Sequence, residues 1–184
     1  MKMNIISSFC IIGFFLMSLN SSSQDVKLNR QERKEVRKAR LAASFTIMDS
    51  LLNEKSFVLE ADYLRNGYGF RIPVLSSLNF IKVDDSRGIL QTGSEIWLGY
   101  NGVGGVTAEG SIGNWKINKN SKNFSYSIQF SLLTQIGHYD VFLNVSADNH
   151  ATATITGLVP GKLTWEGHLT TIDNSRIFKG QNTI

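Results

Sequence analysis

Large apolar and polar side chains alternate without a break in FSYSIQFSL, residues 124–132. A strand with one buried face and one solvated face has this period of two. The pattern returns at residues 139–146, 151–156 and 163–169, and short segments with glycine, proline or asparagine separate these runs. One-sided strands joined by such short connections predict an antiparallel meander.

Shorter strands are expected earlier in the chain, at residues 57–63, 77–83, 89–92 and 107–117. A single helix is too narrow to cover a flat sheet of about eight strands. The mainly β fold is therefore expected to curl into a half-barrel or lipocalin-like barrel, or to split into a two-sheet sandwich. An outer-membrane barrel is excluded because its strands need ~9–11 residues and an apolar face toward lipid, whereas several of these runs are shorter.

The N-terminal helix is expected at residues 29–53, which contain no glycine or proline. Asn29 can cap it, and Glu32 stands three residues on, where a carboxylate reaches back to the cap N–H. Apolar residues recur at helical spacing only in the second half, at Leu41, Phe45, Met48 and Leu52. The sequence thus predicts a charged, partly mobile helical lead at residues 24–40. A single β-rich domain with a docked helix is expected at residues 41–184.

The first residues have the composition of a cleavable signal peptide, residues 1–23. Lys2 gives a positive start, an apolar run follows at residues 5–19, and small polar residues come next. The run is shorter than the ~20 residues that cross a bilayer, so a retained anchor is the weaker alternative. Cleavage beside Gln24 predicts an exported protein, periplasmic or outer-surface associated, that is not an integral membrane protein. Cys10 would leave with the signal, so no disulfide is expected.

The formal net charge is +4, and most of the basic excess lies at residues 30–40. Basic stretches can bind nucleic acid or anionic lipid, but an exported protein is not expected to meet nucleic acid. A solvated helix face is the simplest interpretation. The alternative is a partner-binding segment, with candidate residues Arg30, Arg33, Lys34, Arg37 and Lys38.

A glycine-dense segment at residues 97–107 is the other notable feature. A phosphate-binding loop would need a helix after it, whereas a strand is expected here. Glycine can instead allow a sheet to bend, and aromatic residues beside such a loop can form a ligand site. The candidate ligand-binding residues are Trp97, Tyr100, Asn101, Gly102, Gly104, Gly105 and Thr107.

Catalytic and metal motifs are weak. His138, His150 and His168 are too scattered for a metal site, and no cofactor is expected. Glu166 and His168 share one polar strand face and are the best available acid–base pair, although an exposed cross-strand pair is the ordinary explanation. The residues therefore identify no catalytic site.

Four segments resemble a known family: NFIKV at residues 79–83, GVGGVTAEGSI at 102–112, YDV at 139–141 and WEG at 165–167. They are similar to an exported family of the Bacteroidota catalogued as domain of unknown function 4251. The resemblance implies a bacterial source and a periplasmic or outer-surface address. It brings no activity, cofactor or catalytic residue.

Three functional hypotheses remain. The first is a non-enzymatic envelope module that binds a small molecule, lipid or glycan in the concavity of its curved sheet. The second is a protein-interaction or assembly factor that uses its basic N-terminal helix. The third is a periplasmic enzyme of unknown type.

Overall fold

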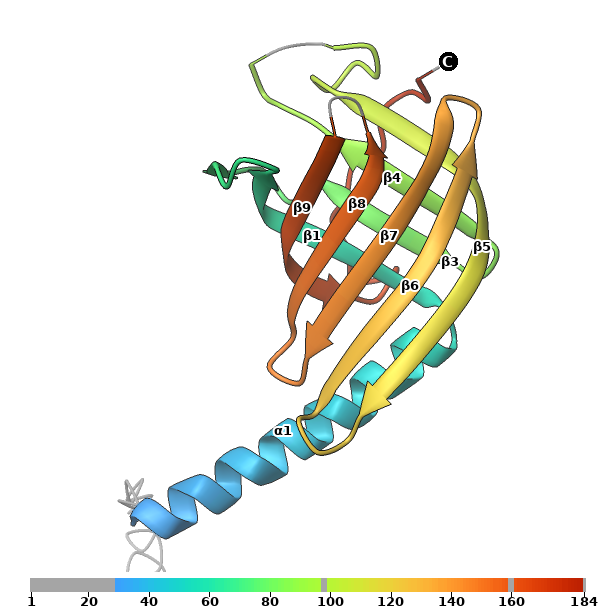
Figure 1. Ribbon diagram of the computed structural model, residues 1–184. Helices are drawn as coiled ribbons and strands as arrows, with labels where there is room; N and C mark the ends of the chain where they lie inside the picture. The colour runs from blue at the N-terminus through green and yellow to red at the C-terminus, as the bar shows by residue number, and fades with distance from the viewer. Residues whose placement is uncertain (1–28, 97–98, 159–160, 184) are drawn as a thin grey trace, which may run out of the picture. The chain divides into compact units, whose positions relative to one another are not determined.

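The computed structural model describes residues 29–96, 99–158 and 161–183 (Figure 1). The chain divides into two units, residues 1–34 and residues 35–184. The first contributes the start of the helix. The second contains the rest of the helix and every described strand.

Helix α1, Arg30–Asn53, begins where the sequence predicts. The Asn29 side-chain oxygen accepts hydrogen bonds from the N–H groups of Gln31 and Glu32, both at 2.9 Å. The Glu32 carboxylate in turn accepts from the Asn29 N–H at 2.8 Å. This reciprocal pair is a capping box, which satisfies N–H groups that have no partner inside the helix. The predicted cap is therefore confirmed.

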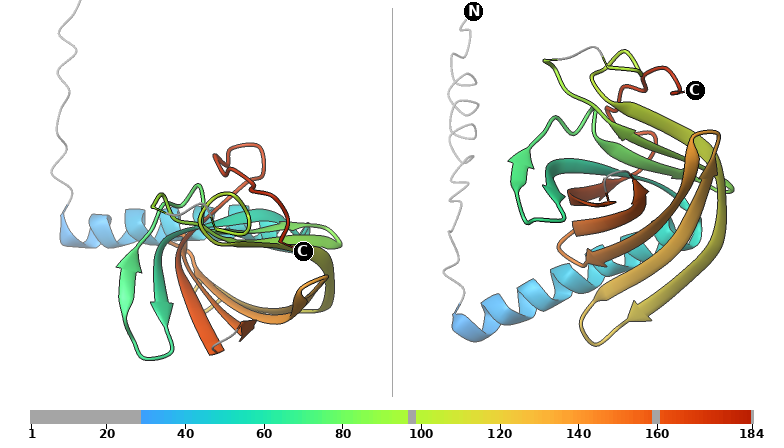
Figure 2. Two further views of the ribbon diagram at one scale, coloured as in Figure 1. Left: turned by 90° about the horizontal axis from the view of Figure 1, so that it is seen from above. Right: turned by 45° about the horizontal axis from the view of Figure 1, so that its top comes forward.

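The described residues form nine strands in a single sheet. They are β1 Ser56–Asn66, β2 Arg71–Pro73, β3 Phe80–Asp84, β4 Arg87–Thr92, β5 Val106–Asn120, β6 Ser125–Thr134, β7 Gly137–Ser146, β8 His150–Leu158 and β9 Gly161–Thr170. Consecutive strands pair antiparallel, except β2 and β3, which both pair with β1 instead of with each other. β9 returns to pair with β1, so all strands but β2 form a closed barrel (Figure 2). The barrel form of the predicted fold is confirmed.

Strand β1 closes the barrel because it is long enough to serve three partners. One edge pairs with β9 over Val58–Asn66. The other edge pairs first with β3 and then, beyond a bulge near Asp62, with β2. At this seam a Cβ atom on Gly167 would overlap the Glu60 carbonyl oxygen, so the close approach of β9 and β1 requires glycine.

The barrel interior is filled by alternate side chains of the strands, which form one apolar cluster. Its largest fully buried members are Trp165, Tyr126, Phe57 and Phe130. Helix α1 adds Phe45, Met48 and Leu52 to the same cluster, and the Phe45 ring stacks on Tyr126 with centroids 4.7 Å apart. The predicted docking face of the helix is therefore confirmed.

Residues 171–183, here called the C-terminal strap, cross the outside of the barrel without helix or strand. The Ser175 hydroxyl donates to the Glu60 carboxylate of β1 at 2.6 Å. The Gln91 amide of β4 donates to the Phe178 carbonyl at 2.8 Å, and its oxygen accepts from the N–H of Gly180 at 2.8 Å. The strap thereby covers part of the outer face of the sheet. Neither the strap nor β2 was predicted from the sequence.

Candidate functional site

A groove of about 520 Å³ opens at the barrel end where β1 stops and β4 leads into the next loop. We call it the rim groove. Its walls come from the β1–β2 hairpin, the loop after β2 and the loop after β4. The apolar lining consists of Leu64, Ile72, Pro73, Val74, Leu75 and Ile96. Ile72 is 56% exposed and Ile96 is 83% exposed, so apolar surface faces water here.

Two asparagines hold the loops that form the rim groove. The Asn66 side chain accepts hydrogen bonds from the N–H groups of Tyr68 and Phe70, both at 3.0 Å, which shapes the tip of the hairpin. The fully buried Asn79 side chain donates to the carbonyls of Leu75 and Gly93 and accepts from the Gly93 N–H. Asn79 thus ties the two loops together beneath the groove.

Three exposed aromatic side chains, Tyr68, Phe70 and Tyr100, lie on the loops at this end of the barrel. They do not line the rim groove itself. Exposed aromatic residues on loops are typical of interaction surfaces, because they bury a large area at a small cost in side-chain entropy. The same barrel end therefore combines an apolar groove with aromatic loop residues.

The glycine-dense loop is organised by two of its predicted ligand residues. Asn101 is 1% exposed, and its amide donates to the Thr92 carbonyl at 3.1 Å and to the Thr107 hydroxyl at 3.0 Å. Its oxygen accepts from the N–H groups of Val103 and Gly105 at 3.1 and 2.9 Å. All four interactions lie within the chain, so these side chains shape the loop.

The other predicted ligand residues are dispersed. Tyr100 is 88% exposed, and Gly102 and Gly104 adopt positive φ. Among the described members of the set, Gly104 alone lines the rim groove. A Cβ atom on Gly105 would overlap the Thr92 carbonyl, so glycine is needed there for close approach. Trp97 lies outside the described residues. Ligand binding by this set remains a prediction.

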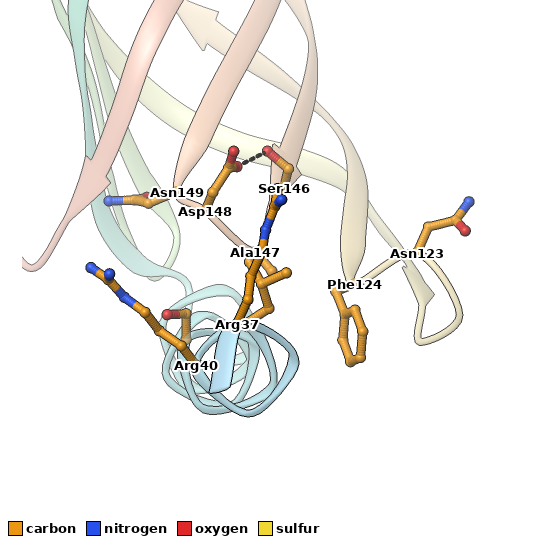
Figure 3. A pocket seen from close by; sticks show the side chains of 10 residues that line it. Arg37, Arg40, Asn123, Phe124, Ser146, Ala147, Asp148 and Asn149 are labelled. Carbon is orange, nitrogen blue, oxygen red and sulfur yellow. Dashed lines mark hydrogen bonds between the residues drawn. The ribbon is translucent and has the colours of Figure 1, made fainter. Parts of the chain in front are cut away.

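A second groove, of about 640 Å³, lies between α1 and the turns that join β5 to β6 and β7 to β8. We call it the helix groove. Figure 3 shows the side chains of Arg37 and Arg40 reaching toward the β7–β8 turn. On that turn the Asp148 carboxylate accepts a hydrogen bond from the Ser146 hydroxyl at 2.6 Å. This bond, with a further one from the His150 N–H, lowers the pKa of Asp148 below its ordinary value.

The predicted partner-binding residues all lie on α1. Arg30, Arg33 and Lys34 belong to its first turns and are exposed. Lys38 is also exposed, and Arg37 lines the helix groove. Their role in partner binding remains a prediction. Among the residues that the structure describes, no helix has the length and apolar character needed to cross a membrane.

The acid–base candidates lie on the outer face of β9 and engage different partners. Glu166 forms ion pairs with Arg65 at 3.0 Å and Arg71 at 2.7 Å. His168 lies 3.5 Å from the Asp62 carboxylate and 3.7 Å from that of Glu60. Neither residue lines the rim groove or the helix groove. The enzyme hypothesis therefore gains no support from this pair.

Metal binding gains no support from the described part of the chain either. Within it, no three or more histidine, cysteine, aspartate or glutamate side chains are grouped as metal ligands. His138, for example, has Asp140 as its carboxylate neighbour at 3.6 Å. A metal site needs three or four converging ligands.

Comparison with known proteins identifies the family. The model of a family described as Domain of unknown function (DUF4251) matches residues 39–169. The chain belongs to the DUF4251 family. A solved structure of a DUF4251 family protein from Bacteroides eggerthii DSM 20697 has 30% sequence identity and a TM-score of 0.62. The similarity covers 74% of this chain and 93% of that chain. No curated protein matches.

The DUF4251 match confirms the resemblance drawn from the sequence. It begins within α1 and ends in β9, so it contains the whole closed barrel and the lining of the rim groove. Arg37 and the C-terminal strap lie beyond its limits. The family description carries no activity, so the function of this DUF4251 protein has to be argued from its surfaces.

Proposed function

We propose that this DUF4251 protein is a non-enzymatic binding module of the bacterial cell envelope, and that it binds an apolar small molecule or a lipid acyl chain in the rim groove. The observation that carries the proposal is the exposed apolar lining of this groove. Exposed apolar surface gathered in a concave site is typical of ligand-binding positions.

The filled interior directs the proposal to the outside of the barrel. Trp165, Phe57 and Phe130 occupy space that a ligand would fill in a hollow barrel. The concave side of the sheet is thus filled by the protein's own core side chains. A ligand is therefore expected between loops at the rim.

The predominantly apolar lining of the rim groove favours a lipid over a glycan, although Thr92, Ser94 and Glu95 also line it. Asn79 lines the groove, but its amide hydrogens and oxygen are already engaged by Leu75 and Gly93. A glycan needs several free donors and acceptors, whereas an acyl chain needs apolar contact. Burying one large aliphatic side chain fully contributes about 1.5–3 kcal/mol. Ile72, Ile96 and Leu75 together can therefore support binding in the micromolar range.

Native mass spectrometry of the protein purified after export, followed by mild denaturation, tests the proposal first. We expect a co-purified lipid or apolar compound in stoichiometric amount. A second assay follows the fluorescence of 11-(dansylamino)undecanoic acid as it binds. The double variant Ile72→Ser/Ile96→Ser should weaken probe binding roughly tenfold, since it removes apolar contact from the groove.

The matched control is Ile47→Ser/Leu133→Ser, which removes two exposed aliphatic side chains outside the rim groove. It should bind the probe as the wild type does. Failure of the wild type to carry a compound or to bind the probe would refute the proposal. Equal weakening in both double variants would also refute it. A protein recovered in place of a small molecule would favour the assembly hypothesis instead.

The envelope location is part of the proposal and rests on the apolar run at residues 5–19, after Lys2. Cell fractionation should place the protein in the periplasm or on the outer surface. Mass spectrometry should find a mature chain that begins beside Gln24. Recovery of a full-length chain from the cytoplasm would contradict this part of the proposal.

A further inference from the structure

Arg37 lies on the face of α1 that docks against the barrel. The docking face is made by residues three or four positions apart, at Leu41, Phe45, Met48 and Leu52. One step of four residues back from Leu41 reaches Arg37. A cation thus occupies the next position of an apolar stripe, where it faces the helix groove.

Arg40 joins Arg37 in the same groove. Residues three apart on a helix have Cβ atoms about 5–6 Å apart, so both guanidinium groups can reach one ligand after a change of rotamer. Figure 3 shows the two side chains extending from α1 toward the β7–β8 turn with their guanidinium groups pointing apart, Arg37 toward Ser146 and Arg40 toward the side of Asn149. In the part of the chain described, no ion pair involves Arg37 or Arg40, and both are exposed.

The opposite wall of the helix groove carries one carboxylate that is already engaged. Asp148 accepts hydrogen bonds from the Ser146 hydroxyl at 2.6 Å and from the His150 N–H at 3.3 Å. The groove thus presents two cations against one anion. Phe124 and Ala147 add apolar surface beside the arginines.

We propose that the helix groove binds a phosphate group between Arg37 and Arg40, either as free phosphate or as the head group of a lipid. A single arginine can satisfy both oxygens of a carboxylate through its two parallel N–H donors. A phosphate has more acceptor oxygens, so it suits two guanidinium groups. The inference uses no residue of the rim groove and stands independently of the proposed function.

The test compares two double variants that remove the same charge. Arg37→Gln/Arg40→Gln empties the groove of cations, and Lys116→Gln/Lys162→Gln removes two exposed cations elsewhere on the barrel. Binding of inorganic phosphate is measured by titration calorimetry. Binding to phosphatidylcholine vesicles that contain phosphatidylglycerol is measured by co-sedimentation.

The arginine variant should weaken binding roughly tenfold or more, whereas the lysine variant should weaken it less than about twofold. Asp148→Asn should tighten binding about two- to threefold, because it removes a like charge from the opposite wall. A loss of calorimetric phosphate binding in the arginine variant identifies free phosphate as a ligand. A loss of vesicle co-sedimentation, without a calorimetric signal, identifies a lipid head group. Circular dichroism confirms that each variant is folded.

Two results would overturn the inference. One is a wild-type protein that binds neither probe. The other is an equal loss in the arginine and lysine double variants, which would mean that overall positive charge, and not the helix groove, attracts the anion.

Discussion

Glu109 of β5 is the principal electrostatic anchor of the C-terminal strap, and replacing it with glutamine should loosen the strap in a pH-dependent way. Its carboxylate pairs with Lys179 and accepts a hydrogen bond from Asn182, both on the strap. It also pairs with Arg87 of β4 at 2.7 Å. The Lys179 hydrogen bond first, then those from Arg87 and Asn182, lower the pKa of Glu109 from 4.5 to about 2.

The size of the effect follows from this pKa difference. A difference of about 2.5 corresponds to about 3 kcal/mol in the free energy of unfolding, at ~1.36 kcal/mol for each tenfold change in proton affinity. The Glu109 side chain is 18% exposed, but Arg87 is 68% exposed and Lys179 is 39% exposed. Solvent screening of these partners reduces the expected contribution to about 1–2 kcal/mol.

The sign is set by the direction of the pKa. A carboxylate with a lower pKa in the folded protein stabilises it above the ordinary pKa of 4.5. This contribution disappears as the pH falls from about 4.5 toward about 2, where the folded protein also takes up the proton. Glu109→Gln should therefore be less stable than the wild type near neutral pH and should equal it near pH 2.

Urea unfolding of wild type and Glu109→Gln, followed by tryptophan fluorescence at about pH 7, 4 and 2, measures the difference directly. Glu95→Gln is the matched control, because Glu95 is exposed on the loop after β4. It should change stability by less than about 0.5 kcal/mol. If the difference between wild type and Glu109→Gln stays constant down to pH 2, the ionised carboxylate is not its source and the reasoning is refuted.

Three further substitutions, at two residues, test the loop and the core. Asn101→Ala removes all four hydrogen bonds of a buried amide, so it should destabilise by about 2–4 kcal/mol in urea unfolding and speed proteolysis between residues 93 and 105; an unchanged cleavage rate would show that the loop is held by other contacts. Trp165→Phe should cost less than about 1.5 kcal/mol, because the indole N–H has no hydrogen-bond partner in the described structure, whereas Trp165→Ala should cost about 3–5 kcal/mol by opening a cavity; similar losses for both would mean that the N–H is satisfied.

The meander could be predicted because strands β6 to β9 alternate apolar and polar residues along almost their whole length. The alternation in the sequence could not distinguish a barrel from a sandwich, since both folds bury one face of each strand. The choice depends on pairing between β1 and β9, which are far apart in the chain. No local pattern shows that Leu64 and Trp165 become partners.

The strap was missed because its anchors are polar. Gln91 and Thr107 sit on the face of their strands that alternation assigns to solvent, yet both are fully buried. A signal was present in the neighbouring strands. Val58 and Phe80 break the alternation by placing apolar side chains on the outer face, and both are fully buried. Two adjacent apolar residues in a one-sided strand indicate that something covers its outside.

The candidate sites were predicted unevenly for a physical reason. Asn101 and Thr107 were chosen for their place in the glycine-dense segment. Once buried, their amide and hydroxyl groups form hydrogen bonds with nearby backbone and side chains. Ile72 and Ile96 were not chosen, because neither the three-residue strand β2 nor the loop after β4 is long and regular enough to show a periodic pattern. Arg37 was chosen for its charge, and its place in the helix groove follows from helical spacing.

A closed barrel with a filled interior restricts where specificity can arise in this protein. The interior side chains form one packed cluster, so substitutions that opened a ligand site among them would lower the stability of the core. The loops at the rim and the turns beside α1 have no such constraint. The rim groove and the helix groove share no lining residue, and they lie at opposite ends of the same barrel. Binding at one groove can therefore be altered without altering the other, and the barrel serves as a rigid support that separates an apolar site from a cationic one.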